Sequence, residues 1–218
     1  MSTQEPAPES GPESAEAYHA RLMDQTDAAG RLPFTVDEAM VAWDIYPYEL
    51  DGLRMKPLAP LADAEPDRQG EDPATCRCRG EGFAEGPLAW SNERWLLKVL
   101  AGGLPSELML QPRAHHDLAD LPADLAAEMG VLIAAVTAAA ESLPSVHRCH
   151  LARYGDGGAH LHLFFWARPA RVLQLRGSTL VDWADQLPPL PDEVRRANAE
   201  HVGAHLVAAV GGQGPSGL

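Results

Sequence analysis

Two histidines alternate with leucine in the stretch His160-Leu-His162-Leu, at the start of the apolar run His160–Ala167. Residues two apart on a strand share a face, so the two imidazoles point one way and the leucines the other. A second apolar stretch, Val146–Tyr154, is joined to this run by Gly155-Asp-Gly-Gly158, whose glycines permit a tight turn. The pattern predicts an antiparallel hairpin with one apolar face and one face that carries histidines.

The rest of the main body supplies more strands and the helices to cover them. Residues 88–100 predict another hairpin, and residues 108–111 predict a short strand that ends at Pro112. Apolar residues recur at helical spacing between Asp120 and Pro144, and Asp192–Val210 predicts a further helix that ends at two glycines. The order predicts an α+β fold, in which helices pack on one side of an antiparallel β-sheet.

The net charge of −14 is distributed unevenly. Residues 1–75 carry 16 acids and 5 bases, a net of −11, whereas residues 76–218 carry 15 acids and 12 bases, a net of −3. An acidic chain is unsuited to sequence-independent binding of nucleic acid or of anionic membranes, so we expect neither partner. No stretch has the roughly 18 consecutive apolar residues of a membrane span, and the first 25 residues lack a secretory signal. We therefore expect a cytoplasmic protein.

Composition also divides the chain into segments. Residues 1–30, rich in Pro, Glu, Ser and Ala, predict a disordered acidic tail. Residues 31–75 combine large apolar side chains with prolines that interrupt regular elements, and they predict an extended leader that wraps the body. We expect one folded domain over residues 76–212 and a frayed C-terminus over residues 213–218.

Four arginines lie close to the histidine-bearing strand: Arg153, Arg168, Arg171 and Arg176. Guanidinium groups bind phosphate oxygens through paired hydrogen bonds, and neutral imidazole suits both metal ligation and nucleophilic attack. Ordinary surface charge explains any one of the arginines, and a solvated sheet face explains the histidines. Together they favour an anionic substrate, for which Arg153, Arg168 and Arg176 are the candidate binding residues.

The chain has three cysteines, Cys76, Cys78 and Cys149, too few for a disulfide framework. The spacing Cys76-Arg-Cys78 is one residue shorter than the usual zinc-knuckle spacing. Two thiolates and two imidazoles would nevertheless complete a tetrahedral zinc site. Cys149 shares a strand face with Leu151, and we interpret it as a core residue.

Three motifs occur in an order that resembles the histidine triad family: Pro112-Arg-Ala-His115, the glycine loop at 155–158 and His160-Leu-His162. The resemblance spans roughly residues 76–170. It includes the zinc-containing branch and the branch of galactose-1-phosphate uridylyltransferase. From Trp43 onward the chain is also similar to actinobacterial proteins with this domain. At the third motif position, where the family has histidine, this chain has Phe164.

The resemblance implies an activity and a metal site. It makes His162 the nucleophile that forms a nucleotidyl-histidine intermediate with a small phosphorylated substrate, a nucleotide, and His160 the second catalytic candidate. The implied activity is that of a nucleotide phosphoanhydride or phosphoramidate hydrolase, or of a nucleotidyltransferase. The resemblance also implies a homodimer and a structural zinc, with the ligands Cys76, Cys78, His115 and His160.

Two alternatives stay open. Phe164 can neither donate nor accept a proton, so the second hypothesis is a non-catalytic protein that binds a nucleotide or a partner through the same face and keeps the zinc. A different register would place Gly158, His160 and His162 at the three motif positions. That register ranks second, because it leaves the zinc site without a fourth ligand.

Overall fold

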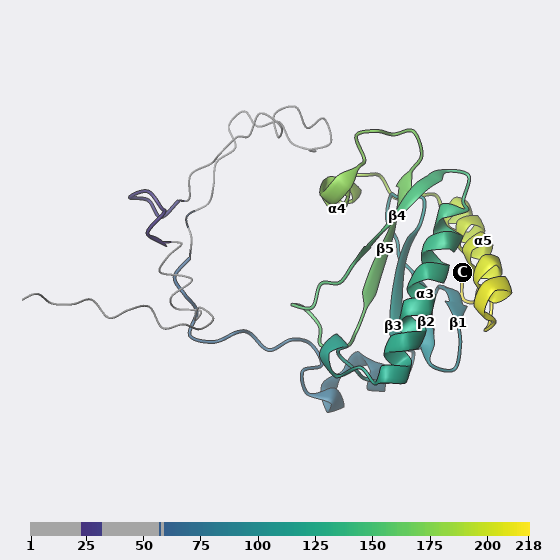
Figure 1. Ribbon diagram of the computed structural model, residues 1–218, viewed down its shortest axis with the longest axis horizontal. Coiled ribbons are helices and arrows are strands. Elements are labelled where there is room, and N and C mark those ends of the chain that lie inside the picture. Colours follow the sequence, from purple (N-terminus) through teal and green to yellow (C-terminus); the bar gives the residue numbers. More distant parts are fainter. Residues whose placement is uncertain (1–22, 32–56, 58) are drawn as a thin grey trace, which may run out of the picture. The chain divides into compact units, whose positions relative to one another are not determined.

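The computed structural model describes residues 23–31, 57 and 59–218 (Figure 1). The chain divides into two units, Met1–Trp43 with Tyr48–Pro66 and Asp44–Pro47 with Asp67–Leu218. In the first unit, Arg31 and Pro57 form an antiparallel bridge. Most of the expected tail and leader, residues 1–22, 32–56 and 58, lies outside the described residues. All the helices and strands discussed below belong to the second unit.

The second unit is built on one antiparallel sheet of five strands in the order β1-β2-β3-β5-β4. The strands are β1 (Leu88–Ser91), β2 (Trp95–Val99), β3 (Glu107–Pro112), β4 (Val146–Ala152) and β5 (Leu163–Pro169). Consecutive strands pair as hairpins except for β3, which pairs with β5 and so brings the histidine-bearing segment to the middle of the sheet. The predicted fold class, α+β with an antiparallel sheet, is confirmed.

Two long helices, α3 (Ala123–Glu141) and α5 (Asp192–Val210), lie side by side on one face of the sheet (Figure 1). Alternate residues of each strand point to these helices and form the main core, for example Leu110 on β3 and Phe165 on β5. Among the described helices α3 alone is long and apolar enough, by length and composition, to cross a membrane. Its packing against the sheet and α5 accounts for that composition.

The opposite face of the sheet is covered only in part. The short helix α4 (Leu180–Ala184) packs there with Leu104, Trp166 and Leu175 in a second, smaller core. The rest of this face carries the residues that alternate with the main core, and it is left open for the site described below. Helices therefore cover one face fully, as the sequence predicts, and the other at one end only.

The histidine segment differs from the expected strand at its start. We expected a strand over His160–Ala167, but β5 begins at Leu163. The backbone before it is hydrogen-bonded elsewhere: Ala159 N–H donates to the carbonyl of Gln69 at 3.1 Å, and Leu161 N–H donates to that of His116 at 2.7 Å. These two bonds fix the segment between the loops that hold the other candidate ligands.

The C-terminal residues, which we expected to fray, are hydrogen-bonded to the edge strand β1. Gln213 and Ser91 exchange two backbone hydrogen bonds of 2.8 and 3.0 Å, and Ser216 and Leu88 exchange another two. Gly212, with φ of +86°, lets the chain turn back onto β1, since a side chain there would strike the indole of Trp90. The unpaired N–H and C=O groups of an edge strand explain why this segment is ordered.

Candidate active site and metal centre

Two short 3₁₀ helices, η1 (Pro73–Thr75) and η2 (Arg77–Arg79), position the candidate metal ligands: Cys76 joins the two helices, and Cys78 lies within η2. The Asp72 carboxylate caps η1 by accepting a hydrogen bond of 2.9 Å from Ala74 N–H. The Cys76 sulfur in turn accepts one from Cys78 N–H at 3.5 Å. These two short turns present both sulfur atoms on the same side of the chain.

The four residues predicted to hold zinc converge, as Cys76, Cys78, His115 and His160 have their ligand atoms all within 4.8 Å of one another. Cys76 Sγ lies 3.7 Å from His160 Nδ1, and Cys78 Sγ lies 3.8 Å from His115 Nδ1. Tetrahedral zinc, with bonds of about 2.3 Å to sulfur and 2.0–2.1 Å to nitrogen, requires sulfur–nitrogen separations of about 3.6 Å. The donor set and its spacing therefore fit zinc.

The surroundings of His160 hold its ring in the orientation that a metal ligand needs. Its second nitrogen, Nε2, donates a hydrogen bond of 2.8 Å to the carbonyl of Pro112, so Nδ1 is the atom free to bind a metal. The ring is 7% exposed and packs edge-on against Phe83, at 5.1 Å between ring centres. Burial lowers the pKa of His160, which favours the neutral, ligating form. A zinc ion bound to Nδ1 would therefore leave neither nitrogen of His160 free for proton transfer.

His162 is oriented differently from His160. Its Nδ1 lies 2.7 Å from the carbonyl oxygen of His160, which can only accept, so Nδ1 carries the proton and Nε2 has the free lone pair. The ring is half-buried and lines a pocket of about 860 Å³ on the open face of the sheet. Gly157 and Gly158 border the same pocket. An imidazole held in one tautomer with Nε2 unprotonated is suited to nucleophilic attack.

Tyr154 and Phe164 line one side of this pocket, with Trp166 packed behind Phe164. Phe164, at the third motif position, contacts His162 edge-on at 5.3 Å and stacks on Trp166 at 5.3 Å with an interplanar angle of 12°. Tyr154 lies about 6 Å from both rings, with centre separations of 6.2 and 5.9 Å. We call Tyr154, Phe164 and Trp166 the aromatic cluster.

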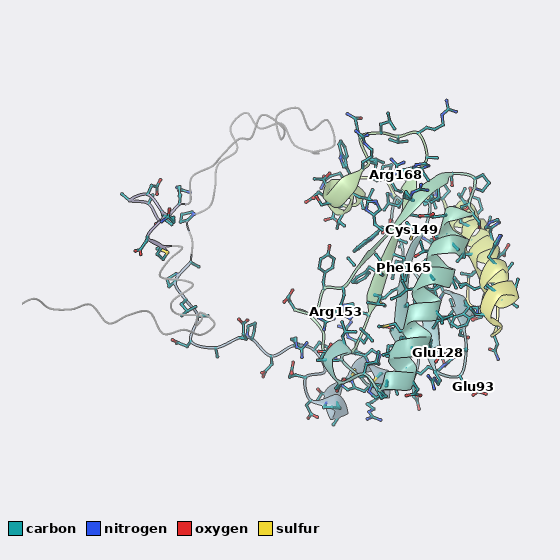
Figure 2. The ribbon with its side chains drawn as sticks, viewed as in Figure 1. Glu93, Glu128, Cys149, Arg153, Phe165 and Arg168 are labelled. Atoms are coloured by element: carbon teal, nitrogen blue, oxygen red, sulfur yellow. The ribbon has the colours of Figure 1, made fainter. Side chains whose placement is uncertain are left out.

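The three arginines predicted to bind substrate do not line the His162 pocket. Arg153 and Arg168 lie toward opposite ends of the β4–β5 hairpin (Figure 2). Arg168 is buried, at 6% exposed, and Arg176 lies on the surface at the start of a later 3₁₀ helix. Spacing along the sequence could not show which of these side chains turn toward the histidines.

A competing carboxylate explains the position of Arg153. The Asp117 side chain forms ion pairs with Arg153 and with Arg68, the latter at 2.7 Å. Burial acts to raise the pKa of Asp117, but the hydrogen bonds from these arginines and from Leu118 N–H outweigh it and lower the pKa. Asp117 therefore ties the segment that precedes the cysteines to the glycine loop.

The residues that line the pocket beside His162 include several that the sequence did not single out: Phe83, Lys98, Gln111 and Tyr154. They come from η2 and its flank, β2, β3 and the end of β4, so only the strand order brings them together. One signal was present in the sequence. Gln111 is the single amide in the apolar strand Leu108-Met-Leu-Gln111, on the face opposite Leu108 and Leu110.

Solved structures with a similar fold are histidine triad proteins and a uridylyltransferase. A histidine triad protein from Marinobacter aquaeolei VT8 is 16% identical with a TM-score of 0.44, over 56% of this chain and 90% of its own. A zinc-bound histidine triad family protein from Mycobacterium smegmatis is 20% identical with a TM-score of 0.41, over 57% of this chain and 90% of its own. A uridylyltransferase mutant is 19% identical with a TM-score of 0.42, over 61% of this chain but 47% of its own.

No family model and no curated protein matches the sequence. The solved structures are of the kinds that the sequence motifs resemble. Their TM-scores lie below 0.5, so these structures assign no role to any residue of this chain.

Proposed function

We propose that the protein is a nucleotidyl hydrolase or nucleotidyltransferase that acts through a covalent intermediate on His162. The observation that carries the proposal is the geometry of this one imidazole. Its Nδ1–H is bound to a backbone carbonyl, and the opposite nitrogen belongs to a ring that lines a pocket of about 860 Å³. The substrate class is a small nucleotide with a phosphoanhydride or phosphoramidate bond.

The reaction takes two displacements at phosphorus. The lone pair of His162 Nε2 forms a bond to the α-phosphorus while the bond from phosphorus to the leaving group breaks, and the leaving group departs with that electron pair. The imidazole becomes positively charged, and its Nδ1–H bond to the carbonyl of His160 stabilises that charge. Water or a second nucleophile then attacks the phosphorus and loses its proton to solvent, and Nε2 regains its lone pair.

Zinc has a separate role in this proposal. The residues that would hold it are Cys76, Cys78, His115 and His160. A zinc ion there would supply structural cross-linking, since these residues would join the Cys76–Cys78 turn to the loop after β3 and to the segment before β5. With His160 as one of its ligands, the zinc would also hold in place the carbonyl that orients His162.

The direct test is to detect the intermediate. The protein is incubated with dinucleoside polyphosphates, nucleoside phosphoramidates and sugar nucleotides, and the adduct is sought by mass spectrometry under non-acidic conditions, because phosphohistidine is labile to acid. We expect an adduct on His162 that is absent from His162→Ala and present in His147→Ala, a control at an exposed histidine on β4. Turnover that is equal in the wild type and His162→Ala would refute the assignment of the nucleophile.

One observation favours a second function. The Phe164 ring occupies the third motif position and contacts His162, where the family resemblance implies a proton-transferring group. A non-catalytic protein that binds a nucleotide in this pocket would show binding of a nucleotide without adduct or turnover in the same experiment. The homodimer and the cytoplasmic location stay predictions of the sequence.

A further inference from the structure

Gln111, on β3, is a buried side chain whose amide nitrogen lacks a hydrogen-bond partner in the described part of the chain. The residue is 4% exposed, and its Nε2 atom has no partner among the described residues. Buried amides in proteins are nearly always hydrogen-bonded, because the bonds to water that they give up must be replaced. Gln111 lines the His162 pocket, so a ligand in that pocket can supply the missing acceptor.

Gln111 and His162 line the same pocket and flank the last residue pair that joins β3 to β5. Leu110 on β3 lies opposite Leu163, the first residue of β5. Gln111 follows Leu110 in the sequence, and His162 precedes Leu163. Both side chains line the pocket. The amide and the imidazole are therefore neighbours on the open face.

Lys98, on β2, brings a positive charge to the same pocket. Its Nζ lies 4.8 Å from the centre of the Phe83 ring, which packs at 5.1 Å against the ring of His160, and all three residues line the pocket with His162. Burial lowers the pKa of Lys98. An anion bound beside Nζ would offset the unfavourable burial of the charge.

We propose that Gln111 and Lys98 form the phosphate-binding wall of the pocket. The Gln111 amide donates a hydrogen bond to a non-bridging oxygen of the phosphoryl group that His162 attacks, and Lys98 binds further phosphate oxygens of the same ligand. Gln111, on the neighbouring strand β3, supplies the hydrogen bond that Phe164 cannot make. Lys98 supplies the positive charge that was expected from Arg153, Arg168 and Arg176, which lie outside the pocket. The inference rests on the proposed function of His162.

The wall also gives the substrate an orientation. Lys98 and Gln111 lie on the β2–β3 side of His162, whereas the aromatic cluster lies on the β5 side. Phosphate oxygens therefore face β2 and β3. The part of the ligand next to Phe164 is apolar or aromatic, because the Phe164 ring offers a face and edges but no hydrogen-bond donor.

Kinetics of Gln111→Leu and Lys98→Met test the wall. With a substrate that the wild type turns over, we expect kcat/KM to fall about tenfold or more in each variant, the effect of losing one hydrogen bond or contact to a charged group. Gln186→Leu, at an exposed glutamine outside the pocket, should match the wild type. Adding Phe164→Gln to Gln111→Leu should restore part of the rate of adduct formation, which a purely structural role of Gln111 would not allow.

A binding experiment separates the failure of the wall from the failure of the proposed function. If the wild type forms no adduct, the proposed function fails, and calorimetry with AMP and with inorganic pyrophosphate still tests the wall. Weaker binding by Gln111→Leu and Lys98→Met than by the wild type and Gln186→Leu supports it. Equal affinity of all four proteins, or no binding by the wild type, overturns it. If Gln111→Leu does not fold, Gln111→Asn, which keeps an amide on a shorter side chain, takes its place in both experiments.

Discussion

Asp117 offers the sharpest test of how the cysteine-bearing segment is held on the sheet. Its carboxylate binds Arg68, which precedes the cysteines, and Arg153, which precedes the glycine loop. Asp117→Asn removes the charge but keeps the cap on the 3₁₀ helix Leu118–Asp120, because asparagine also accepts the hydrogen bond from Leu118 N–H. The substitution therefore isolates the two ion pairs.

The structure sets the size of the expected effect. Charge-assisted hydrogen bonds contribute about 1.5–3 kcal/mol when shielded from water, and exposed ion pairs about 0.2–1 kcal/mol. The side chain of Asp117 is 19% exposed, and those of Arg68 and Arg153 are 28% and 31% exposed. An intermediate contribution of about 1 kcal/mol for each pair gives a loss of about 2 kcal/mol in the free energy of unfolding.

Urea unfolding followed by the fluorescence of the buried Trp90 and Trp95 measures this loss. With a slope of about 2 kcal/mol per molar urea, the midpoint of Asp117→Asn should fall by about 1 M, at an unchanged slope. Asp156→Asn, at an exposed aspartate in the glycine loop, is the control and should match the wild type. A difference below about 0.5 kcal/mol, the ordinary effect of a surface substitution, would refute the reasoning.

The pH dependence of that difference has a definite sign. Because the folded-state pKa of Asp117 lies below its ordinary value of 3.8, the carboxylate stabilises the fold fully above the unfolded pKa. The contribution is lost as the pH falls through the lower, folded pKa. The gap between wild type and Asp117→Asn should therefore stay constant from about pH 8 to about pH 5 and shrink below about pH 4.

Two further predictions concern the metal and the packing of α5. Protein purified without chelator should contain about one zinc per chain by metal analysis. Cys76→Ser should lose this zinc and unfold at a lower temperature. Cys149→Ser, a substitution outside the cluster, should keep it. A full zinc content in Cys76→Ser would contradict the ligand assignment. Gly203→Ala should lower the free energy of unfolding by about 1–3 kcal/mol, because its Cβ would overlap the carbonyl oxygen of Ala89 on β1. Gly130→Ala on α3, where the added Cβ meets nothing within 4 Å, should raise the free energy of unfolding by about 0.5–1 kcal/mol. Calorimetric unfolding of both variants measures the two changes. Equal changes would argue against close packing of α5 on β1.

Local sequence patterns predicted the elements more successfully than they predicted the site. The helix expected over Asp192–Val210 has those bounds in the structure, because its periodicity, acidic first turn and terminal glycines all agree. The strand expected from His160 starts at Leu163 instead, since Gln69 and His116 take up the backbone hydrogen bonds before it. Contacts with distant loops of this kind leave no trace in a local pattern.

The sequence likewise predicted the metal centre better than it predicted the pocket beside His162. Convergence of the two thiols and two imidazoles followed from a motif order that the sequence displays directly. The pocket did not, because Lys98 and Gln111 reach His162 only through the pairing of β2 with β3 and of β3 with β5. Arg153 was misplaced since its partner, Asp117, lies 36 residues away in the sequence.

The backbone bonds between the C-terminal residues and β1 also bear on self-association. An uncovered edge strand is a template for pairing with other chains, and Gln213 and Ser216 occupy that template on β1. Among the described strands this leaves β4 as the edge that can accept another strand, and its outward residues His147 and Arg148 are polar. Removing the residues after Val210 would free the β1 edge as well, and the sheet would then be open to pairing at both ends.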